Sequence, residues 1–400
     1  MRLGIYGGSF NPPHRGHLTA AAAAAERLRL DKLLLIPAGI PPHKEVARTA
    51  ASAEHRAAMT ALMAEQAALM TSIPVELSRM EIERAGKSYT VDTLRALREK
   101  YADAELWLLV GTDMFATFQD WHKPEEILSY AALCAFGRNE ADTRETLELR
   151  RRFLEERFPG ARIETMTNPE LVEISSSELR AALPEDGGAQ YLTPQVYGYI
   201  LREHLYGTNL NLTRLTPEQL RPIALSYLKA KRVRHVLGVE EEAMRLAERC
   251  GADVHKARFA ALLHDCTKRL GLYEQLALCA QYGVELDELE RHALKLLHAK
   301  TGAAIARAVY GADDEVYGAI LWHTTGRADM TLLEKVIYLA DYIVPSRDFD
   351  GVDTLREAVY ADLDRGLELG LKMSIEELEE RGSPVHRNTR EAYEYIKNRN

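Results

Sequence analysis

The chain has 400 residues, of which 46% are hydrophobic and 28% charged, and its formal net charge at pH 7 is −9. This length favours two domains, because single hydrophobic cores stop growing at about 250–300 residues. The acidic balance argues against a general nucleic-acid-binding surface, so phosphate ligands would have to be held locally by helix N-termini, a few Lys or Arg side chains, or metal ions.

The N-terminus and the cysteines predict the compartment. No basic segment with a cleavage-site pattern opens the chain, and no apolar run reaches the ~18–20 residues that a membrane span needs. The four cysteines form no CxxC pair and are too sparse for a disulfide framework. We therefore expect a cytoplasmic protein with neither a signal peptide nor a membrane partner. The sequence leaves its oligomeric state open.

Strand and helix patterns alternate through the first half of the chain. Apolar runs predict strands at residues 2–8, 32–39, 105–114 and 130–138, and amphipathic stretches predict helices at about 15–30, 54–69 and 90–101. This alternation predicts an α/β fold, a doubly wound parallel sheet covered by helices, with ligands at the carboxyl ends of the strands. We expect this domain to span residues 1–207.

The pattern changes after residue 207. Residues 208–215 are polar and rich in turn formers, which suits a linker, and Thr216 followed by Pro217 is typical of a helix start. From there to Asn400 the periodicity is helical, without a convincing alternating strand pattern. The sequence therefore predicts an all-α domain over residues 216–400.

The stretch YGGSFNPPHRGH, from Tyr6 to His17, joins the first predicted strand to the first predicted helix. It contains neither GxGxxG nor a Walker lysine, but it places His14 and His17 three residues apart on one opening turn. Glycines let the backbone approach a phosphate, and a helix N-terminus offers unpaired N–H groups. Two imidazoles in this position can donate hydrogen bonds as charge develops in phosphoryl transfer. The alternative is a capped helix with two surface histidines.

The pattern G-x-F-x-P-x-H-x-G-H, from Gly8 to His17, resembles the signature of the HxGH nucleotidyltransferases. More narrowly, the first half is similar to bacterial nicotinate-nucleotide adenylyltransferases, which join ATP and nicotinate mononucleotide into nicotinate adenine dinucleotide and release pyrophosphate. The resemblance implies a Rossmann-like nucleotidyltransferase fold and Mg²⁺ accompanying the ATP. It implies that His14 and His17 are catalytic and that the nucleotide is bound by Gly7, Gly8, Ser9 and Phe10.

The same resemblance implies further binding residues. The segment ISSSELR corresponds to a second superfamily motif, in which hydroxyls cap a helix that meets the ATP phosphates, and Ser177 stands where threonine is common. The implied residues are Ser175, Ser176, Ser177 and Arg180 for ATP, Lys44 for a phosphate, Thr90 and the His122 amide for the pyridine carboxylate, Gly111 and Asp113 for the ribose, and Trp121 for stacking on the nicotinate ring.

Alternatives exist for these assignments. Taken singly, Trp121 also fits a core aromatic residue, and Lys44 a solvated surface charge. The first half could also adenylylate another phosphate acceptor, such as pantetheine phosphate. Trp121 and the segment SYTVDT favour nicotinate.

Histidine and aspartate recur in the helical half in the order H…HD…H…H…D. The six residues are His235, His264, Asp265, His298, His323 and Asp341. Four imidazoles and two carboxylates suit iron, manganese or similar ions, and a carboxylate can bridge two metals. A lone helical histidine is more often structural, and we assign that role to His255, His292 and His386.

This order resembles the HD-domain phosphohydrolases, and residues 213–400 are similar more narrowly to YqeK-type HD proteins, which hydrolyse diadenosine tetraphosphate to two ADP. The likeness is carried by HDCTK, WHTTG and ADYIVPSRDF. It implies a binuclear centre of iron or manganese, dinucleoside polyphosphates as substrates, and Lys268 and Arg347 as cations for the polyphosphate, although surface ion pairs would also explain these two. The whole chain is expected to be a bifunctional enzyme; the alternative is a helical half that binds metal and nucleotide as a regulatory module without turnover.

Overall fold

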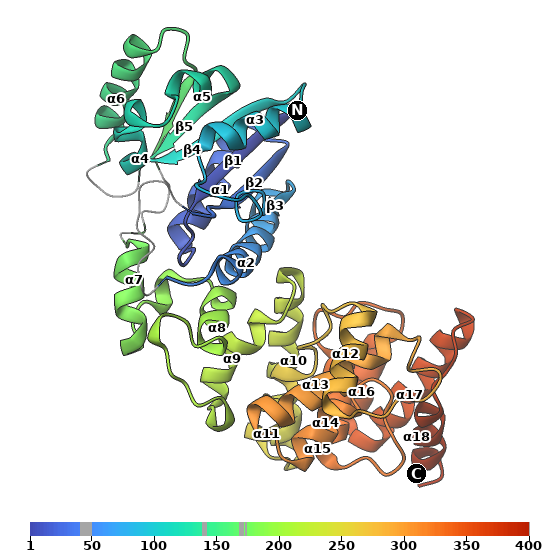
Figure 1. Cartoon of the computed structure of the whole chain (residues 1–400). Helices are drawn as coiled ribbons and strands as arrows, with labels where there is room; N and C mark the ends of the chain where they lie inside the picture. The colour runs from blue at the N-terminus through green and yellow to red at the C-terminus, as the bar shows by residue number, and fades with distance from the viewer. Residues whose placement is uncertain (41–49, 138–141, 168–171, 173, 400) are drawn as a thin grey trace. The chain divides into compact units, whose positions relative to one another are not determined.

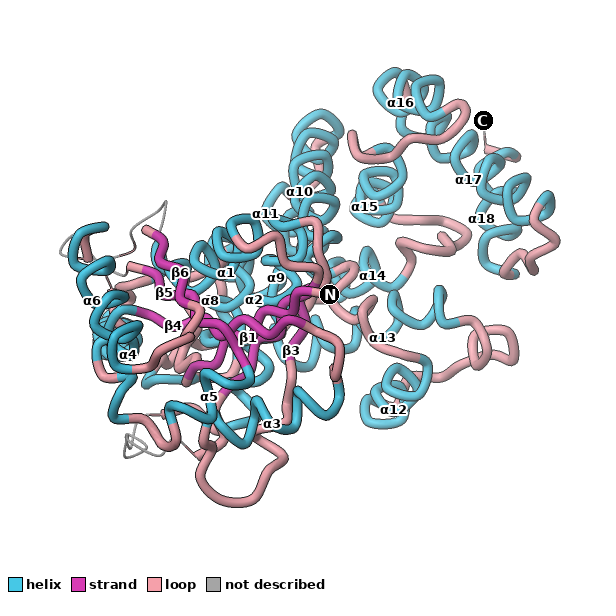
Figure 2. The backbone as a smooth tube through the Cα atoms, turned by 90° about the horizontal axis from the view of Figure 1, so that it is seen from above, coloured by secondary structure: helices cyan, strands magenta, loops and turns pink. Residues whose placement is uncertain are grey.

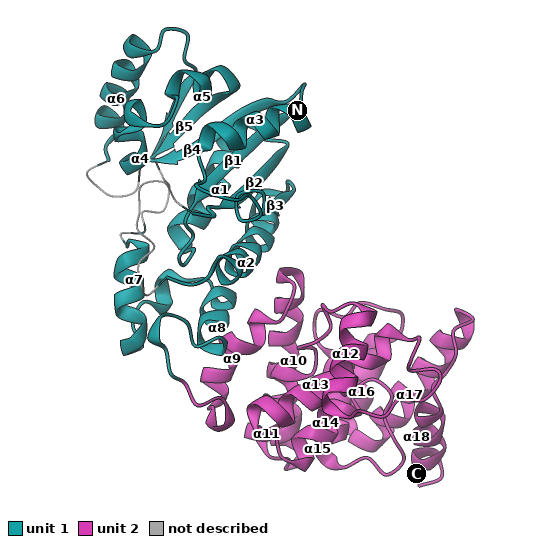
Figure 3. Ribbon diagram, viewed as in Figure 1, with its two compact units in different colours: residues 1–209 teal, residues 210–400 magenta. Residues whose placement is uncertain are grey.

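The computed structural model describes residues 1–40, 50–137, 142–167, 172 and 174–399 (Figure 1). Lys44, which the sequence suggests as a phosphate partner, lies outside these residues. The chain divides into two compact units, residues 1–209 (unit 1) and residues 210–400 (unit 2), as Figure 3 shows.

A parallel six-stranded sheet forms the centre of unit 1. Its strands are β1 (Arg2–Gly8), β2 (Lys32–Pro37), β3 (Val75–Leu77), β4 (Glu105–Gly111), β5 (Ala131–Phe136) and β6 (Ile163–Met166). They lie in the order β3-β2-β1-β4-β5-β6. The chain runs outward from β1 to β3 and then returns to the other side of β1 at β4. Doubly wound sheets bind ligands where the strand order reverses, here between the carboxyl ends of β1 and β4.

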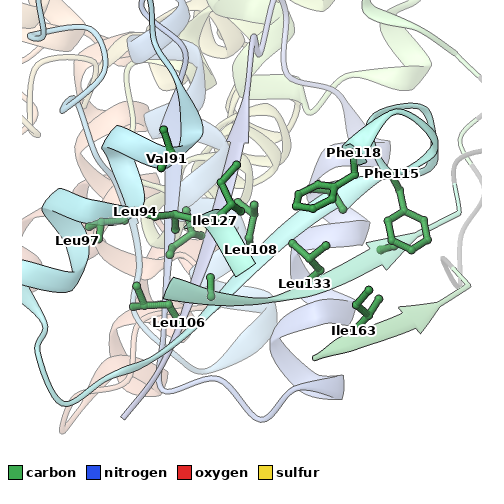
Figure 4. Close-up of a cluster of buried hydrophobic side chains, with 14 of the residues drawn as sticks. Val91, Leu94, Leu97, Leu106, Leu108, Phe115, Phe118, Ile127, Leu133 and Ile163 are labelled. Carbon is green, nitrogen blue, oxygen red and sulfur yellow. The ribbon is translucent and has the colours of Figure 1, made fainter. Parts of the chain in front are cut away.

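Helices cover both faces of this sheet, because side chains alternate along each buried strand. Leu3 and Ile5 of β1 join a core cluster with α3 (Thr90–Lys100), α5 (Pro124–Tyr130) and α6 (Arg144–Arg157). Tyr6 joins a cluster on the opposite face with α1 (Arg15–Arg27) and α2 (Ala53–Thr71). Figure 2 shows the strands between these two layers, and Figure 4 shows the first cluster. The predicted fold class is confirmed for this half of the chain.

The core cluster of Figure 4 predicts a large stability effect at Leu133. This residue lies on β5 and is fully buried. Leu133→Ala is expected to lower the free energy of unfolding by about 2–5 kcal/mol, because the lost methyl groups leave a cavity. Leu149→Ala on α6 is the matched control: Leu149 is 60% exposed, so its loss is expected to stay within about 0.5 kcal/mol. Urea unfolding of the full chain measures both, and equal losses would contradict this packing.

The strand predicted to reach Met114 is too long. β4 ends at Gly111, and α4 (Thr112–Ala116) begins directly after it with Asp113 in its first turn. An acidic residue there favours a helix N-terminus over a continuing strand. Unit 1 also contains α7 (Ser176–Ala182), α8 (Pro194–Arg202) and the short 3-10 turns η1 (Phe118–Asp120), η2 (Leu183–Glu185), η3 (Ala189–Tyr191) and η4 (Leu205–Gly207).

The described residues of unit 2 are helical and contain no strand, which confirms the predicted all-α class. They form η5 (Leu212–Arg214), α9 (Pro217–Ser226), α10 (Ala230–Cys250), α11 (Val254–Leu263), α12 (Leu272–Tyr282), α13 (Leu294–Tyr310), α14 (Asp314–Leu321), α15 (Leu332–Ile343), α16 (Val352–Ala361), α17 (Leu363–Glu380) and α18 (Arg387–Lys397).

Helix α9 begins where the sequence predicts. Thr216 accepts a hydrogen bond from the backbone N–H of Gln219 at 3.3 Å, and the Gln219 side chain accepts one from the backbone N–H of Thr216 at 3.1 Å. Further along, α10 packs against α11 and α15, while α14 packs against α11, α13 and α15. These contacts bring together the helices that carry the predicted metal ligands. Among the described residues, no helix has both the length and the apolar character needed to cross a bilayer.

Candidate active sites

The first site lies at the carboxyl end of β1. Gly7 and Gly8 end this strand, His14 is the N-cap of α1, and His17 lies in the first turn of that helix. Both histidines are buried, with 4% and 7% exposure, and their ring centroids are 3.8 Å apart. The backbone N–H of His14 donates to Nδ1 of His17 at 3.2 Å. The two imidazoles therefore lie side by side, next to the point where the strand order reverses.

Tight packing around this loop explains Gly8, Gly16 and Phe10. The Phe10 side chain is fully buried and contacts the rings of Tyr6 and His17, with centroid distances of 5.5 and 5.2 Å. A Cβ atom on Gly8 would lie 3.2 Å from the Phe10 ring, and one on Gly16 would lie 3.1 Å from the His14 ring. Phe10 therefore supports His17, and only its backbone is left to contact a nucleotide.

Side chains from two helices hold the carbonyl groups of this loop. Arg56 of α2 donates to the Ser9 carbonyl at 3.0 Å, and Arg180 of α7 donates to the Asn11 carbonyl at 2.7 Å. The Ser176 hydroxyl donates to the carbonyl of Pro12 at 3.1 Å. These contacts bring the two predicted motifs, YGGSFNPPHRGH and ISSSELR, together.

The start of α7 is stabilised by its own serines. The Ser175 hydroxyl accepts from the Glu178 backbone N–H at 3.1 Å, and the Glu178 carboxylate accepts from the Ser175 N–H at 2.7 Å, which is a capping box. Ser177 accepts from Arg180 at 3.0 Å. Ser175 is therefore occupied as a helix cap, and Arg180 as a support of the neighbouring loop.

The residues predicted to bind nicotinate come together at the amino end of α3. Thr90 is the first residue of this helix and Tyr89 is its N-cap. The Tyr89 ring lies 4.6 Å from the ring of His122, which is exposed. Trp121 is half-buried against Phe118, and its buried indole N–H has no hydrogen-bond partner among the residues that the structure describes. Thr90, Trp121 and His122 thus belong to one region of the surface.

Gly111 and Asp113 lie at the end of β4, the strand that pairs with β1 across the reversal point. Gly111 is the buried N-cap of α4, and Asp113 is exposed in the first turn of that helix. The structure therefore places both residues on the same edge of the sheet as His14 and His17.

The second site lies in unit 2, where six predicted ligands converge from five segments. His235 is on α10, His264 and Asp265 follow α11, His298 is on α13, His323 follows α14, and Asp341 is on α15. Each of the six is at most 9% exposed. Two triads with donor atoms within 4.8 Å of one another share His264: one includes His235 and Asp341, the other Asp265 and His323.

Short distances connect the triads. Nε2 of His235 lies 2.8 Å from Oδ1 of Asp341, and Nε2 of His298 lies 3.2 Å from Oδ1 of Asp265. Nε2 of His298 is also 3.1 Å from Nε2 of His323. His298 therefore lies beside the second triad as a fourth donor, and all six side chains direct nitrogen or oxygen atoms into one small volume.

The ring orientations fit a metal centre. Nδ1 of His264 lies 2.6 Å from the Ala261 carbonyl, and Nδ1 of His323 lies 2.7 Å from the Ile320 carbonyl. A carbonyl oxygen only accepts, so each Nδ1 carries the hydrogen and each Nε2 of a neutral ring has a free lone pair. Nε2 of His264 is buried, and no described residue forms a hydrogen bond with it. A buried lone pair among carboxylates and imidazoles suits a divalent metal, and the same donors suit iron and manganese.

Electrostatics keep these groups in ligand-competent forms. Burial alone would raise the pKa of Asp265, but His264, His298 and Lys268 hold that pKa well below its usual range. Burial would likewise raise the pKa of Asp341, but the hydrogen bond with His235 and the neighbouring His264 and Arg347 hold that pKa well below its usual range. Burial lowers the pKa of the His235, His298 and His323 imidazoles. Ionised carboxylates beside neutral imidazoles are the protonation states that bind metals.

The two cations predicted for the polyphosphate are paired with these carboxylates. Lys268 Nζ lies 3.0 Å from Asp265 Oδ1, and Arg347 donates to Asp341 Oδ1 at 3.1 Å. The two side chains are 38% and 36% exposed, so they lie at the rim of the site. Both cations therefore form ion pairs, as the alternative to polyphosphate binding predicted. Their partners, however, are two of the predicted metal ligands.

Sequence reasoning missed Arg232. Its Nε donates to Asp265 Oδ2 at 2.6 Å, and its guanidinium lies 3.8 Å from Asp341 Oδ1. Arg232 precedes His235 by three residues on α10, so the two share a helix face. That spacing is the signal in the sequence that could have identified it.

The hydrogen bonds of His386 support a structural role. Its Nδ1 accepts from the Asn388 backbone N–H at 3.1 Å, and its Nε2 lies 3.0 Å from Asp287. Glu290 also lies nearby, but Lys300 donates to it at 2.6 Å. Both ring nitrogens are therefore occupied in stabilising the start of α18.

Comparisons with known proteins find a match in each unit of the chain. Residues 5–182 match the family model described as cytidylyltransferase-like, and residues 232–345 match the HD domain model. The fold and sites therefore define a nucleotidyltransferase-like α/β unit joined to an HD domain.

Individual relatives show to which nucleotidyltransferase family the chain belongs. A probable nicotinate-nucleotide adenylyltransferase from Methylibium petroleiphilum is 39% identical over 210 residues, which are 51% of this chain and 92% of the relative. The corresponding protein from Gemmatimonas aurantiaca is 37% identical over 207 residues, covering 52% and 92%. The chain belongs to the nicotinate-nucleotide adenylyltransferase family. A crystal structure of a predicted HD superfamily hydrolase involved in NAD metabolism from Clostridium acetobutylicum has 40% identity and a TM-score of 0.45, covering 46% of this chain and 99% of that one.

Proposed function

We propose that unit 1 transfers the adenylyl group of ATP to nicotinate mononucleotide. The observation that carries this proposal is the buried pair of His14 and His17 beside the reversal point of the sheet, in a chain that belongs to this family. A phosphate oxygen of the mononucleotide attacks the α-phosphorus of ATP, the bond to the β-phosphate bridging oxygen breaks, and pyrophosphate leaves. The two imidazoles donate hydrogen bonds to phosphoryl oxygens as negative charge develops on them.

The remaining groups of unit 1 hold the two nucleotides. The backbone of Gly7, Gly8, Ser9 and Phe10 approaches the ATP phosphates. The N-terminus of α7, which Ser175, Ser176 and Ser177 form, faces the same phosphates with Arg180 as a nearby cation, and Lys44 binds a phosphate. Mg²⁺ accompanies the ATP and screens its charge. Gly111 and Asp113 contact ribose, while Thr90 and the His122 amide bind the pyridine carboxylate, with Trp121 against the ring.

Trp121 provides a test of the acceptor. Trp121→Ala is expected to raise KM for nicotinate mononucleotide about tenfold, because base–aromatic stacking contributes about 1–3 kcal/mol, while KM for ATP stays nearly constant. Trp121→Phe retains an aromatic face and is expected to restore most of the affinity. Initial rates with each substrate varied in turn measure both constants. Equal changes in the two KM values would indicate that Trp121 stabilises the fold through its contact with Phe118 and does not stack on the pyridine ring.

The reaction itself is tested with purified full-length protein, ATP, Mg²⁺ and one acceptor at a time. Rapid formation of nicotinate adenine dinucleotide from nicotinate mononucleotide supports the proposal. Preferential turnover of nicotinamide mononucleotide would show that the acceptor is the amide rather than the acid. Preferential turnover of pantetheine phosphate would show that unit 1 does not catalyse the proposed reaction.

We propose further that unit 2 hydrolyses diadenosine tetraphosphate symmetrically to two ADP. The supporting observation is the convergence of the six buried donor groups around Asp265, whose carboxylate faces His264, His298 and His323 and could bridge two adjacent metals. Bound iron or manganese would supply a water of lowered pKa and positive charge near the attacked phosphorus. His235, His264, Asp265, His298, His323 and Asp341 hold the metals. Lys268 and Arg347, exposed at the rim, contact the polyphosphate.

Product analysis separates this function from a regulatory module. Full-length protein supplied with Fe²⁺ or Mn²⁺ is expected to convert diadenosine tetraphosphate to ADP alone. Formation of AMP and ATP would indicate asymmetric cleavage. Saturable binding of the dinucleotide with no product would instead support a metal-dependent binding module.

A further inference from the structure

Arg56 carries a buried positive charge beside the first site. It lies in the first turn of α2, and 8% of it is exposed. One terminal nitrogen donates to the Ser9 carbonyl at 3.0 Å and the other to the Gly39 carbonyl at 3.2 Å. These carbonyls follow the adjacent strands β1 and β2, which pair up to Gly8 and Pro37. The guanidinium therefore bridges the ends of two strands at the ligand-binding edge of the sheet.

The hydrogen-bond partners of Arg56 are neutral. Among the residues that the structure describes, no carboxylate forms an ion pair with it, and its two terminal nitrogens donate to backbone carbonyls. Arg258 of unit 2 is comparably buried but pairs with Glu218 at 2.6 Å and Glu240 at 3.1 Å. Burying a charge is costly unless an opposite charge compensates it. Burial lowers the pKa of the Arg56 guanidinium, and the nearby Tyr206 opposes this effect only in part.

A second cation acts on the same loop. Arg180 donates to the Asn11 carbonyl at 2.7 Å, two residues after the carbonyl bound by Arg56. The Asn11 side chain in turn accepts from the Tyr206 hydroxyl at 2.8 Å and from the Ala51 backbone N–H at 3.2 Å. Two guanidinium groups and a neutral polar network thus support the loop that leads to His14. Within the described residues, nothing at this position neutralises the added charge.

We propose that Arg56 is a positioning residue for phosphate: it fixes the ends of β1 and β2, and its charge is balanced by the phosphates of the bound nucleotides. This inference rests on the proposed adenylyl transfer. Arg56 acts through the Ser9 and Gly39 backbone and through its positive potential, while His14 and His17 act on the reacting phosphoryl group.

Three variants of the full chain test the proposal. Arg56→Gln removes the charge, and Arg56→Lys keeps the charge but loses the fork that spans two carbonyls. Arg98→Gln is the matched control, because Arg98 also donates to backbone carbonyls, those of Ala102, Ala104 and Tyr130, at the opposite edge of the sheet. Steady-state kinetics give KM for ATP and kcat, and thermal unfolding with and without inorganic pyrophosphate gives phosphate binding without catalysis.

The expected pattern is specific. Arg56→Gln raises KM for ATP about tenfold or more, the effect of losing one charged interaction, and loses the pyrophosphate-induced rise in Tm. Arg56→Lys recovers much of both, and Arg98→Gln changes neither. Equal kinetics and equal pyrophosphate response in the two Gln variants would overturn the proposal.

If Arg56→Gln does not fold, an Arg56→Lys variant with wild-type KM and kcat would show that bridging is dispensable and would also overturn it. If the wild-type chain binds pyrophosphate but transfers no adenylyl group, the proposed function fails while the binding comparison still tests Arg56.

Discussion

Replacing His17 by alanine is expected to lower kcat for nicotinate adenine dinucleotide formation by about 10²–10³-fold, the usual cost of removing one donor to a charged transition state. KM for ATP is expected to change much less, because the imidazole acts mainly on charge that develops during transfer. The geometry supports a large effect. His17 is buried, held by Phe10 and directly beside His14.

His55→Ala is the matched control for this experiment. His55 lies on α2 of the same unit, and its ring contacts the hydroxyl of Tyr199 at 2.9 Å and the Tyr199 ring. Its removal is expected to leave kcat within a few-fold of the wild-type value. Thermal unfolding followed by circular dichroism checks that both variants fold as stably as the wild-type protein at the assay temperature. A His17→Ala variant as active as His55→Ala would show that this imidazole is a helix cap and nothing more.

Replacing Asp265 by alanine is expected to abolish hydrolysis of diadenosine tetraphosphate and to reduce the metal content of the protein. Asp265 lies within 3.2 Å of His298 and 3.9 Å of His323, so its carboxylate reaches several members of the proposed centre. Removing it takes away a negative charge and leaves Arg232 and Lys268 beside the remaining ligands. Unpaired cations there oppose metal binding, so the effect is expected to exceed that of losing one neutral ligand.

The metal content is measured by plasma emission spectroscopy and the release of ADP by chromatography. Asp265→Asn removes the negative charge but keeps a side chain of nearly the same shape as aspartate. Asp287→Asn is the control. Asp287 lies with Glu290 and His386 in a separate cluster of unit 2, where it contacts the structural His386. Nicotinate adenine dinucleotide formation by unit 1 is expected to be unchanged in all three variants. Retained metal and retained hydrolysis in Asp265→Asn would remove Asp265 from the centre.

The sequence predicts most of the sheet, but not its edges. Long apolar runs identify β1, β2, β4 and β5, because buried parallel strands leave a continuous hydrophobic signal. β3 spans three residues and β6 four, and both lie at the edges of the sheet. Runs this short carry too little periodicity to separate a strand from a loop.

The two sites differ in how much of each can be predicted. His14 and His17 share one helical turn, so their spacing already implies that they face the same way. The six predicted ligands of unit 2 come from five separate segments, and only a family resemblance joins them before the fold is known. Arg56 and Arg232 were missed because their partners lie far away in sequence: the carbonyls of Ser9 and Gly39, and the carboxylate of Asp265.

The central claim is that this chain handles phosphates at two chemically different sites, one using imidazoles and backbone N–H groups, the other using resident transition metals. The most direct measurement assays both reactions on one preparation after a strong chelator has removed transition metals and been dialysed away. With Mg²⁺ alone, formation of nicotinate adenine dinucleotide is expected to persist and tetraphosphate hydrolysis to be lost, returning only with Fe²⁺ or Mn²⁺. Loss of both reactions together, or hydrolysis that survives with Mg²⁺ alone, would contradict the claim.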